Sequence, residues 1–155
     1  MPSASDLLGD RRRVLVTGGA GFIGGAVVRR LLRETTVTVF NLDKMGYASD
    51  LSSIEDVLSE LGEEANDRHR LQQVDLTDAA AVEAAVQEAD PDLVMHLAAE
   101  SHVDRSISGP GVFIESNVKG TYNLLQAVRG HYEGLSGERR DGFRMHHIST
   151  DEVFG

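Results

Sequence analysis

Two adjacent carboxylates, Asp151 and Glu152, follow an apolar run over residues 143–148. The run predicts a buried strand, and in an open α/β sheet ligands bind at the carboxyl ends of the strands. Carboxyl groups held side by side have pKa values that are pushed apart, so one can donate a proton while the other accepts one. The pair is therefore a candidate general acid and general base. A solvated pair that caps a helix is the alternative.

The elements that must position this pair alternate between strands and helices along the chain. Apolar and β-branched runs predict strands over 14–17, 35–42, 71–76, 93–98 and 143–149. Helical spacing of apolar residues predicts helices over 24–34, 51–61 and 112–132, and a further helix that Thr77 or Asp78 caps. Polar segments over 63–70, 99–111 and 133–142 predict loops.

This alternation is typical of an α/β fold with a doubly wound parallel sheet, the Rossmann arrangement. Right-handed crossovers then give the strand order 3-2-1-4-5. We expect residues 1–13 to be a flexible flank, and residues 14–155 to form one dinucleotide-binding domain that is incomplete after its fifth strand.

Composition excludes several classes of function. A chain of 155 residues that is 41% hydrophobic and 26% charged predicts a single globular domain. The net charge of −10 argues against nucleic acid or an anionic membrane surface as a partner. Cysteine is absent, which excludes disulfides and thiol chemistry, and no apolar stretch approaches the roughly 20 residues of a membrane span. We expect a cytoplasmic protein.

A glycine-rich segment follows the first strand and opens the first helix. Gly18 permits a tight turn, Gly21 lets the backbone approach a pyrophosphate, and Gly24 allows close packing of helix and strand. Phe22 and Ile23 lie between them, where the helix N-terminus supplies N–H donors to a phosphate. A dinucleotide is the predicted ligand.

Acidic residues end the next two predicted strands. Asp43 lies 19 residues after Gly24, where a carboxylate accepts from ribose hydroxyls and favours NAD over NADP. Lys44 follows and would weaken that preference. Asp75 and Leu76 end the third strand, where they would flank an adenine. His146 and His147 have no acidic or cysteine partners at ligand spacing, so no metal site is expected.

Longer motifs make the chain resemble the extended short-chain dehydrogenases/reductases that act on nucleotide sugars, and among them the dTDP-glucose 4,6-dehydratase family. The motifs are the glycine segment and residues 41–44, 96–106, 113–121 and 149–153. Sister families of 4-epimerases and decarboxylases share the glycine segment. They are not expected to carry an Asp-Glu pair after the Ser-Thr of the fifth strand.

The resemblance implies a bound NAD and the substrate dTDP-glucose. It implies that Asp151 is the acid, that Glu152 is the base, and that Thr150 hydrogen-bonds the sugar. Ser101 would lie near both nicotinamide and substrate. Further cofactor contacts implied are Met45, Gly46, Leu97, Ala98, Ala99, Glu100 and Ser116.

The resemblance also implies parts that these 155 residues do not contain. The family carries a Tyr-x-x-x-Lys motif on the helix after the fifth strand, and a C-terminal substrate domain. We therefore expect the 155 residues alone not to be a competent dehydratase. The parent protein would be a homodimer, whereas oligomerisation of this part alone is doubtful. A different extended reductase and a non-catalytic dinucleotide-binding module stay open as alternatives.

Overall fold

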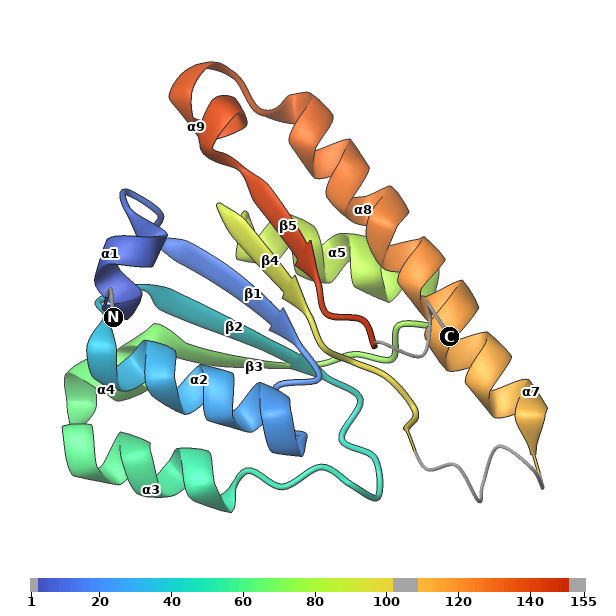
Figure 1. Cartoon of the computed structure of the whole chain (residues 1–155), viewed down its shortest axis with the longest axis horizontal. Coiled ribbons are helices and arrows are strands. Elements are labelled where there is room, and N and C mark those ends of the chain that lie inside the picture. Colours follow the sequence, from blue (N-terminus) through green and yellow to red (C-terminus); the bar gives the residue numbers. More distant parts are fainter. Residues whose placement is uncertain (1–2, 102–108, 151–155) are drawn as a thin grey trace.

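Five parallel strands form one sheet in the computed structural model, which describes residues 3–101 and 109–150. The strand order is β3-β2-β1-β4-β5, as predicted from the sequence (Figure 1). The strands are β1 (Arg13–Thr17), β2 (Thr38–Asp43), β3 (His69–Gln73), β4 (Leu93–His96) and β5 (Arg144–His147). Every adjacent pair is parallel, so all five carboxyl ends meet at one edge of the sheet.

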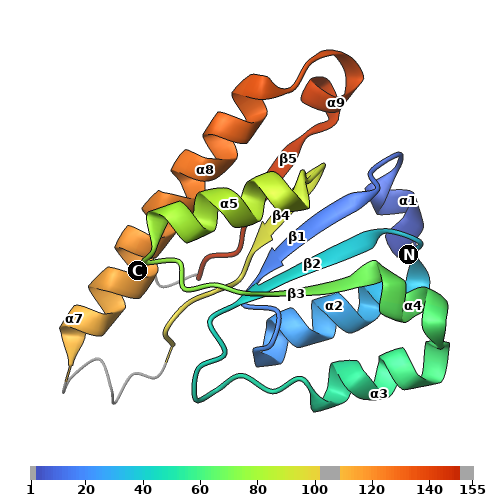
Figure 2. The ribbon, with the colours of Figure 1, turned by 180° about the vertical axis from the view of Figure 1, so that it is seen from behind.

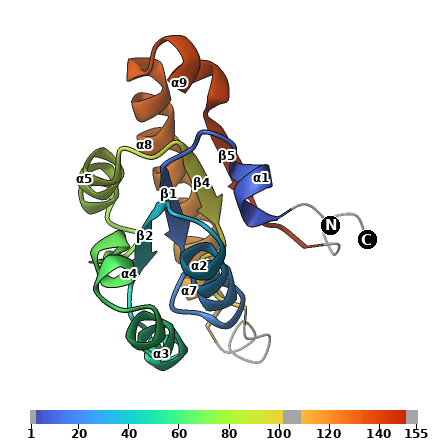
Figure 3. The ribbon, with the colours of Figure 1, turned by 90° about the vertical axis from the view of Figure 1, so that its left-hand side faces the viewer.

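Helices cover both faces of the sheet. One layer holds α1 (Ala4–Leu8), α2 (Phe22–Glu34), α3 (Ser52–Leu61) and α4 (Glu63–Arg68). The other holds α5 (Ala79–Ala89) and α8 (Gly120–Gly134), which lie in front of the strands in Figure 2. Figure 3 shows α5 on one side of β1 and β4 and α1 on the other. The shorter elements are α7 (Pro110–Phe113), the π-helix η1 (Ile114–Lys119) and α9 (Gly137–Gly142).

The two helical layers bury alternate side chains of the central strand. Val14 and Val16 pack against α2 and α3, whereas Leu15 packs against α5 and α8, because successive residues of a strand point to opposite faces. All three are completely buried. Burial on both faces explains the uninterrupted apolar run of β1, and each such side chain stabilises the fold by about 1.5–3 kcal/mol.

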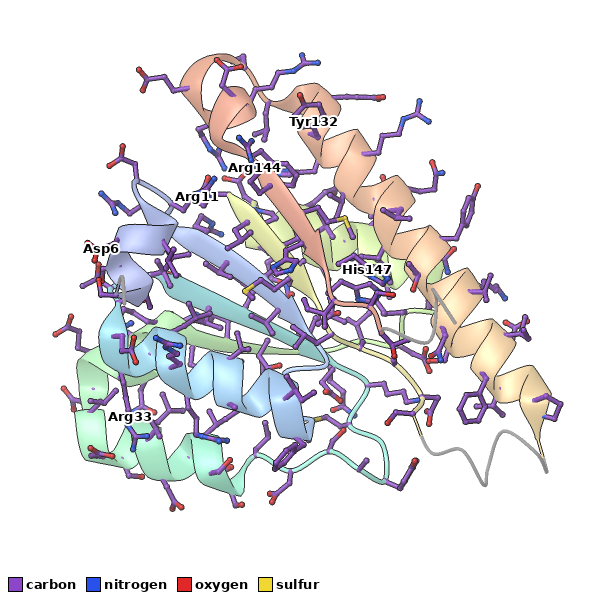
Figure 4. All side chains as sticks on the ribbon, in the orientation of Figure 1. Asp6, Arg11, Arg33, Tyr132, Arg144 and His147 are labelled. Carbon is purple, nitrogen blue, oxygen red and sulfur yellow. The ribbon has the colours of Figure 1, made fainter. Side chains whose placement is uncertain are left out.

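The N-terminal segment, expected to be a flexible flank, is partly helical. Ser3 and Asp6 form a reciprocal capping box at the start of α1, and Leu8 is buried in the core beneath α2. Arg11, labelled with Asp6 in Figure 4, donates to the Leu8 carbonyl at 3.0 Å and to the Gly142 carbonyl at 2.6 Å. These bonds tie the segment to the turn before β5.

Two of the predicted loops contain short helices. Residues 63–68 form α4, although only Ala65 of that helix is buried. Arg68 at its end donates to three carbonyls, those of Leu32, Thr35 and Val37, and so fastens α4 to the end of α2. A polar helix held by one side chain in this way has no apolar periodicity to reveal it. The predicted loop over 133–142 likewise contains α9.

The fifth strand was predicted to be buried, and that prediction was wrong. Arg144, His146 and His147 are exposed and Met145 is half-buried, because β5 forms an edge of the sheet that the described helices cover only through α8. The predicted long helix over 112–132 is also divided, since residues 114–119 take π-helical geometry. Within the described ranges, no helix is both long and apolar enough to cross a membrane.

Candidate functional site

The glycine segment forms a tight turn between β1 and α2. Gly18 has φ of +71°, and a Cβ there would lie 2.7 Å from both Cα and N of Ala98. A Cβ on Gly24 would lie 2.0 Å from the Gly18 carbonyl oxygen, so helix and turn touch backbone to backbone. Gly21 is the N-cap of α2 and provides no side-chain capping bond. The turn is therefore packed on its inner side and open at the helix N-terminus.

Two apolar side chains stand exposed in the first turn of α2. Phe22 is 95% exposed and Ile23 is 62% exposed. Gly19, which the sequence analysis did not single out, lies against Asn41 of β2: a Cβ there would be 2.1 Å from Asn41 Oδ1. Asn41 is completely buried, and its Oδ1 has no hydrogen-bond partner among the described residues. In the sequence, the second glycine of the pair at 18–19 is the feature that could have indicated this contact.

Asp43 joins the glycine segment to the segment after β2. Its Oδ2 accepts from the Ala20 N–H at 3.0 Å, and its Oδ1 accepts from the Met45 N–H at 2.9 Å and the Ser49 hydroxyl at 2.7 Å. The residue is 7% exposed. A carboxylate offers about four acceptor positions, so these bonds leave room for one further donor, such as a ribose hydroxyl. Gly46 follows Met45, which adopts the left-handed conformation with φ of 57°.

Lys44 carries the positive charge of this region. Its Nζ lies 2.5 Å from Glu100 Oε1, which joins the segments that follow β2 and β4. The Thr77 N–H, at 2.9 Å from Asp75 Oδ1, holds the pKa of the Asp75 carboxyl below its ordinary value, and the Thr77 hydroxyl and the charge of Lys44 lower that pKa further. Asp75 is exposed, whereas the Leu76 side chain is buried in the core.

The segment after β4 is held by main-chain and side-chain bonds. The Leu97 N–H donates to the Thr17 carbonyl at 3.1 Å. Asn117 of η1 accepts from the Glu100 N–H at 2.8 Å and donates to the Glu100 carbonyl at 2.9 Å. The predicted contact residues of this region are Ala98, half-buried, Ala99 and Ser101, both exposed, and Ser116, half-buried on η1. The sequence analysis predicted Ser116 as a cofactor contact and did not identify the two bonds from Asn117 to Glu100.

A buried histidine links three elements beneath the site. His96 Nδ1 lies 2.6 Å from the Thr17 hydroxyl of β1, and Nε2 lies 3.0 Å from the Thr121 hydroxyl of α8. Burial lowers the pKa of His96 to about 4, and the nearby His147 lowers it further in the same direction. The ring is therefore neutral at neutral pH, and one threonine hydroxyl donates to it while the other accepts from it.

The carboxyl edge thus brings together Gly18, Gly21, Gly24, Asp43, Lys44, Asp75 and Glu100 from four strand ends. Thr150 lies exposed beyond the end of β5. The predicted acid and base, Asp151 and Glu152, lie outside the described residues. A groove of about 400 Å³ adjoins the ion pair and is lined by Lys44, Tyr47, Glu100 and Phe113, among others. A groove of about 650 Å³ between α5, α8 and α9 contains none of these strand-end residues.

The described parts of the chain, 3–101 and 109–150, contain no group of three His, Asp or Glu side chains that could hold a metal ion. The donors at the carboxyl edge are instead main-chain N–H groups at the N-terminus of α2, and the Asp43 carboxylate lies at the end of the neighbouring strand β2. This set fits a dinucleotide, whose pyrophosphate is bound by N–H groups and whose ribose hydroxyls are bound by a carboxylate.

Comparison with known proteins agrees with this geometry. The chain is 50% identical over 144 residues to a dTDP-glucose 4,6-dehydratase of Neisseria meningitidis, an alignment that covers 93% of this chain and 39% of the relative. A dTDP-glucose 4,6-dehydratase of Shigella flexneri is also 50% identical, with 92% and 38% covered. The chain therefore spans about two fifths of the length of the curated relatives that it matches.

Solved structures show the same fold. A double mutant of DesIV, a dTDP-glucose 4,6-dehydratase of Streptomyces venezuelae, with NAD bound, is 40% identical with a TM-score of 0.66, covering 77% of this chain and 36% of that one. A UDP-glucose 4-epimerase of Stenotrophomonas maltophila with bound NAD is 28% identical with a TM-score of 0.72, covering 93% and 38%. The resemblance predicted from the sequence is confirmed.

A family model described as GDP-mannose 4,6 dehydratase matches residues 15–155, nearly the whole of the Rossmann domain described above. The chain belongs to this family.

Proposed function

We propose that the chain is the NAD-binding part of an enzyme that dehydrates dTDP-glucose to dTDP-4-keto-6-deoxyglucose. The observation that carries this proposal is the 50% identity to dTDP-glucose 4,6-dehydratases over more than nine tenths of the chain. The solved 4-epimerases named among similar structures are 26–37% identical. The geometry of the carboxyl edge supports the cofactor part of the proposal.

The cofactor would be held by groups from four strand ends. The N–H groups at the start of α2 would bind the pyrophosphate, and Gly21 would leave space for it. Asp43 would accept from a ribose hydroxyl, and Asp75 would lie beside the adenine. The exposed side chains of Phe22 and Ile23 would become shielded from water when they pack against the cofactor. When bound, NAD supplies a reversible acceptor for the hydride that leaves C4 of the sugar, and the resulting oxidation of C4 acidifies the proton at C5.

The chain's own acid and base would carry out the elimination. Glu152 would take the proton from C5, and Asp151 would protonate the hydroxyl that leaves C6, so that water departs. Thr150 and Ser101 would hydrogen-bond the sugar and hold these two carbons beside the carboxyl groups. An acid and a base adjacent in sequence suit this task because the two reacting carbons are neighbours.

A homodimer is part of the same proposal. Ile114, Val118, Tyr122 and Leu125 lie three or four residues apart along η1 and α8, and each is 47–61% exposed. Residues at this spacing share one face of a helix, and a second subunit of the parent protein would cover that face.

A 4-epimerase is the second candidate, because a structure with that activity has a TM-score of 0.72 to this chain. The two candidates differ in the mass of the product: dehydration removes one water from the nucleotide sugar, whereas epimerisation leaves the mass unchanged. The protein in its full natural length should therefore be incubated with dTDP-glucose and its products weighed by mass spectrometry.

Two variants make this test specific. E152Q should lower the rate of water loss by about 100-fold or more, since it removes a general base without changing side-chain size. E138Q, on α9 and at the opposite end of β5, is the matched control and should keep wild-type turnover. An epimeric product would reject the dehydratase assignment, and full water loss by E152Q would reject the role of Glu152 as the base. NAD binding without any turnover would favour the alternative of a non-catalytic dinucleotide-binding module.

A further inference from the structure

The ion pair between Lys44 and Glu100 crosses the site. Lys44 follows β2 and Glu100 follows β4, and these two strands flank β1 in the sheet (Figure 1). The Nζ–Oε1 distance is 2.5 Å. The Glu100 side chain is 12% exposed and the Lys44 side chain is 38% exposed, so the carboxylate is the better shielded partner. An ion pair with one shielded partner is screened less by solvent than an exposed pair.

The main chain of Glu100 is also held in position. Asn117 bonds both the N–H and the carbonyl of Glu100, at 2.8 and 2.9 Å. These bonds hold the main chain from which the Glu100 side chain reaches Lys44.

Lys44 occupies the position that decides between two cofactors. It directly follows Asp43, whose place at the end of β2 is that of the ribose-binding acid, and a cation near this acid accommodates the 2′-phosphate of NADP. A lysine at this point would attract that phosphate, which carries a charge of about −1.5 to −2 at neutral pH. In this structure Lys44 is already paired, and its charge also acts on Asp75.

The surroundings of Lys44 are consequently negative. The Glu100 carboxylate pairs with the Lys44 ammonium, and the Asp75 carboxylate lies within electrostatic reach of the same charge. A 2′-phosphate entering this region would meet these acids and would have to displace Glu100 from Lys44. A ribose hydroxyl needs only an acceptor, so it is neither repelled by these acids nor required to separate Glu100 from Lys44.

We propose that Glu100 is a positioning residue that selects NAD against NADP by holding the Lys44 ammonium away from a 2′-phosphate. This inference rests on the proposed function, because it requires that the chain binds a dinucleotide. It assigns the selectivity to a residue 57 positions after the ribose-binding acid in sequence, where no pattern in the first two strands would locate it.

The test compares dissociation constants for NAD and NADP, measured by calorimetry at fixed ionic strength with the protein in its full natural length. E100Q keeps the side-chain size and the main-chain bonds to Asn117 but removes the charge. We expect the ratio of the NADP constant to the NAD constant to fall at least tenfold. The double variant E100Q/K44M should restore a ratio near that of the wild type, because it has no ammonium at position 44 to bind the 2′-phosphate.

A matched control removes a similar charge without touching the site. E115Q breaks the exposed pair between Glu115 and Lys119 on η1, which has a distance of 2.8 Å, and should leave the ratio unchanged. A ratio within threefold of the wild type in E100Q overturns the inference, and so does an equal fall in E100Q/K44M. If the wild type binds NAD, such results reject this inference alone. If the wild type binds neither dinucleotide, the proposed function fails together with it.

Discussion

Acidification should destabilise this protein in part through the buried His96. The ordinary pKa of a histidine is 6.5, and burial of His96 lowers it to about 4 in the folded chain. Between these values the unfolded chain binds a proton that the folded chain does not, so the free energy of unfolding falls as pH falls from about 6.5 to 4. Above this window the imidazole is neutral in both states, and His96 then adds no pH dependence.

The size of this effect follows from the two pKa values. Linkage gives a loss of about 2 kcal/mol between pH 7 and pH 4.5 from His96 alone. Carboxylates with lowered pKa values, Asp75 and Asp92, also lose their stabilising charge on acidification. Their contribution is the same in the wild type and in a variant at position 96, so the difference between two pH profiles isolates the histidine.

The assay is urea unfolding at a series of pH values, followed by circular dichroism, for the wild type and H96Q. H96Q keeps a polar side chain between Thr17 and Thr121 but cannot titrate, so its profile should be flatter by about 2 kcal/mol. H146N, which removes an exposed histidine from β5, is the control and should reproduce the wild-type profile. Profiles of wild type and H96Q that stay parallel within about 0.5 kcal/mol would refute the reasoning.

Two further perturbations test how the site is held. Gly19→Ala should lower the free energy of unfolding by about 1–3 kcal/mol, because its Cβ would lie 2.1 Å from the buried Asn41 Oδ1. Urea unfolding measures this loss, and the double variant G19A/N41A should recover part of it. The control G111A should be nearly neutral, because a Cβ on Gly111 meets nothing within 4 Å. Asn117→Ala should weaken NAD binding about tenfold by releasing both main-chain bonds to Glu100, and unchanged affinity by calorimetry would contradict this role.

Local patterns were sufficient for the order of the main elements. Strands β1, β2 and β4 are buried apolar runs, and the helices between them carry apolar residues at helical spacing, so both periods are visible in the sequence. The turn at Gly18 was also predictable, because a positive φ and contact with Ala98 require glycine there. Handedness of the crossovers then leaves one strand order.

Short helices held by a few specific contacts were not predictable in this way. The short helix α4 depends on Arg68 and its bonds to distant carbonyls, and α1 depends on a capping box and one buried leucine. The burial of β5 was predicted wrongly from its apolar run, although the predicted strand order already placed this strand at an edge of the sheet, where only α8 among the described helices covers it. Each of these features rests on contacts between residues far apart in the chain.

The sequence by itself determined the fold class, the glycine turn and the identity of the charged residues at the strand ends, since these depend on residue types at short spacing. Only the tertiary structure decided which of those charges meet. Lys44 pairs with Glu100, 56 residues away, and Asn117 bonds the main chain of Glu100, because parallel strands bring their carboxyl ends to one edge whatever their separation in sequence. The strength of a charge depends on what surrounds it, and that environment exists only in the folded chain.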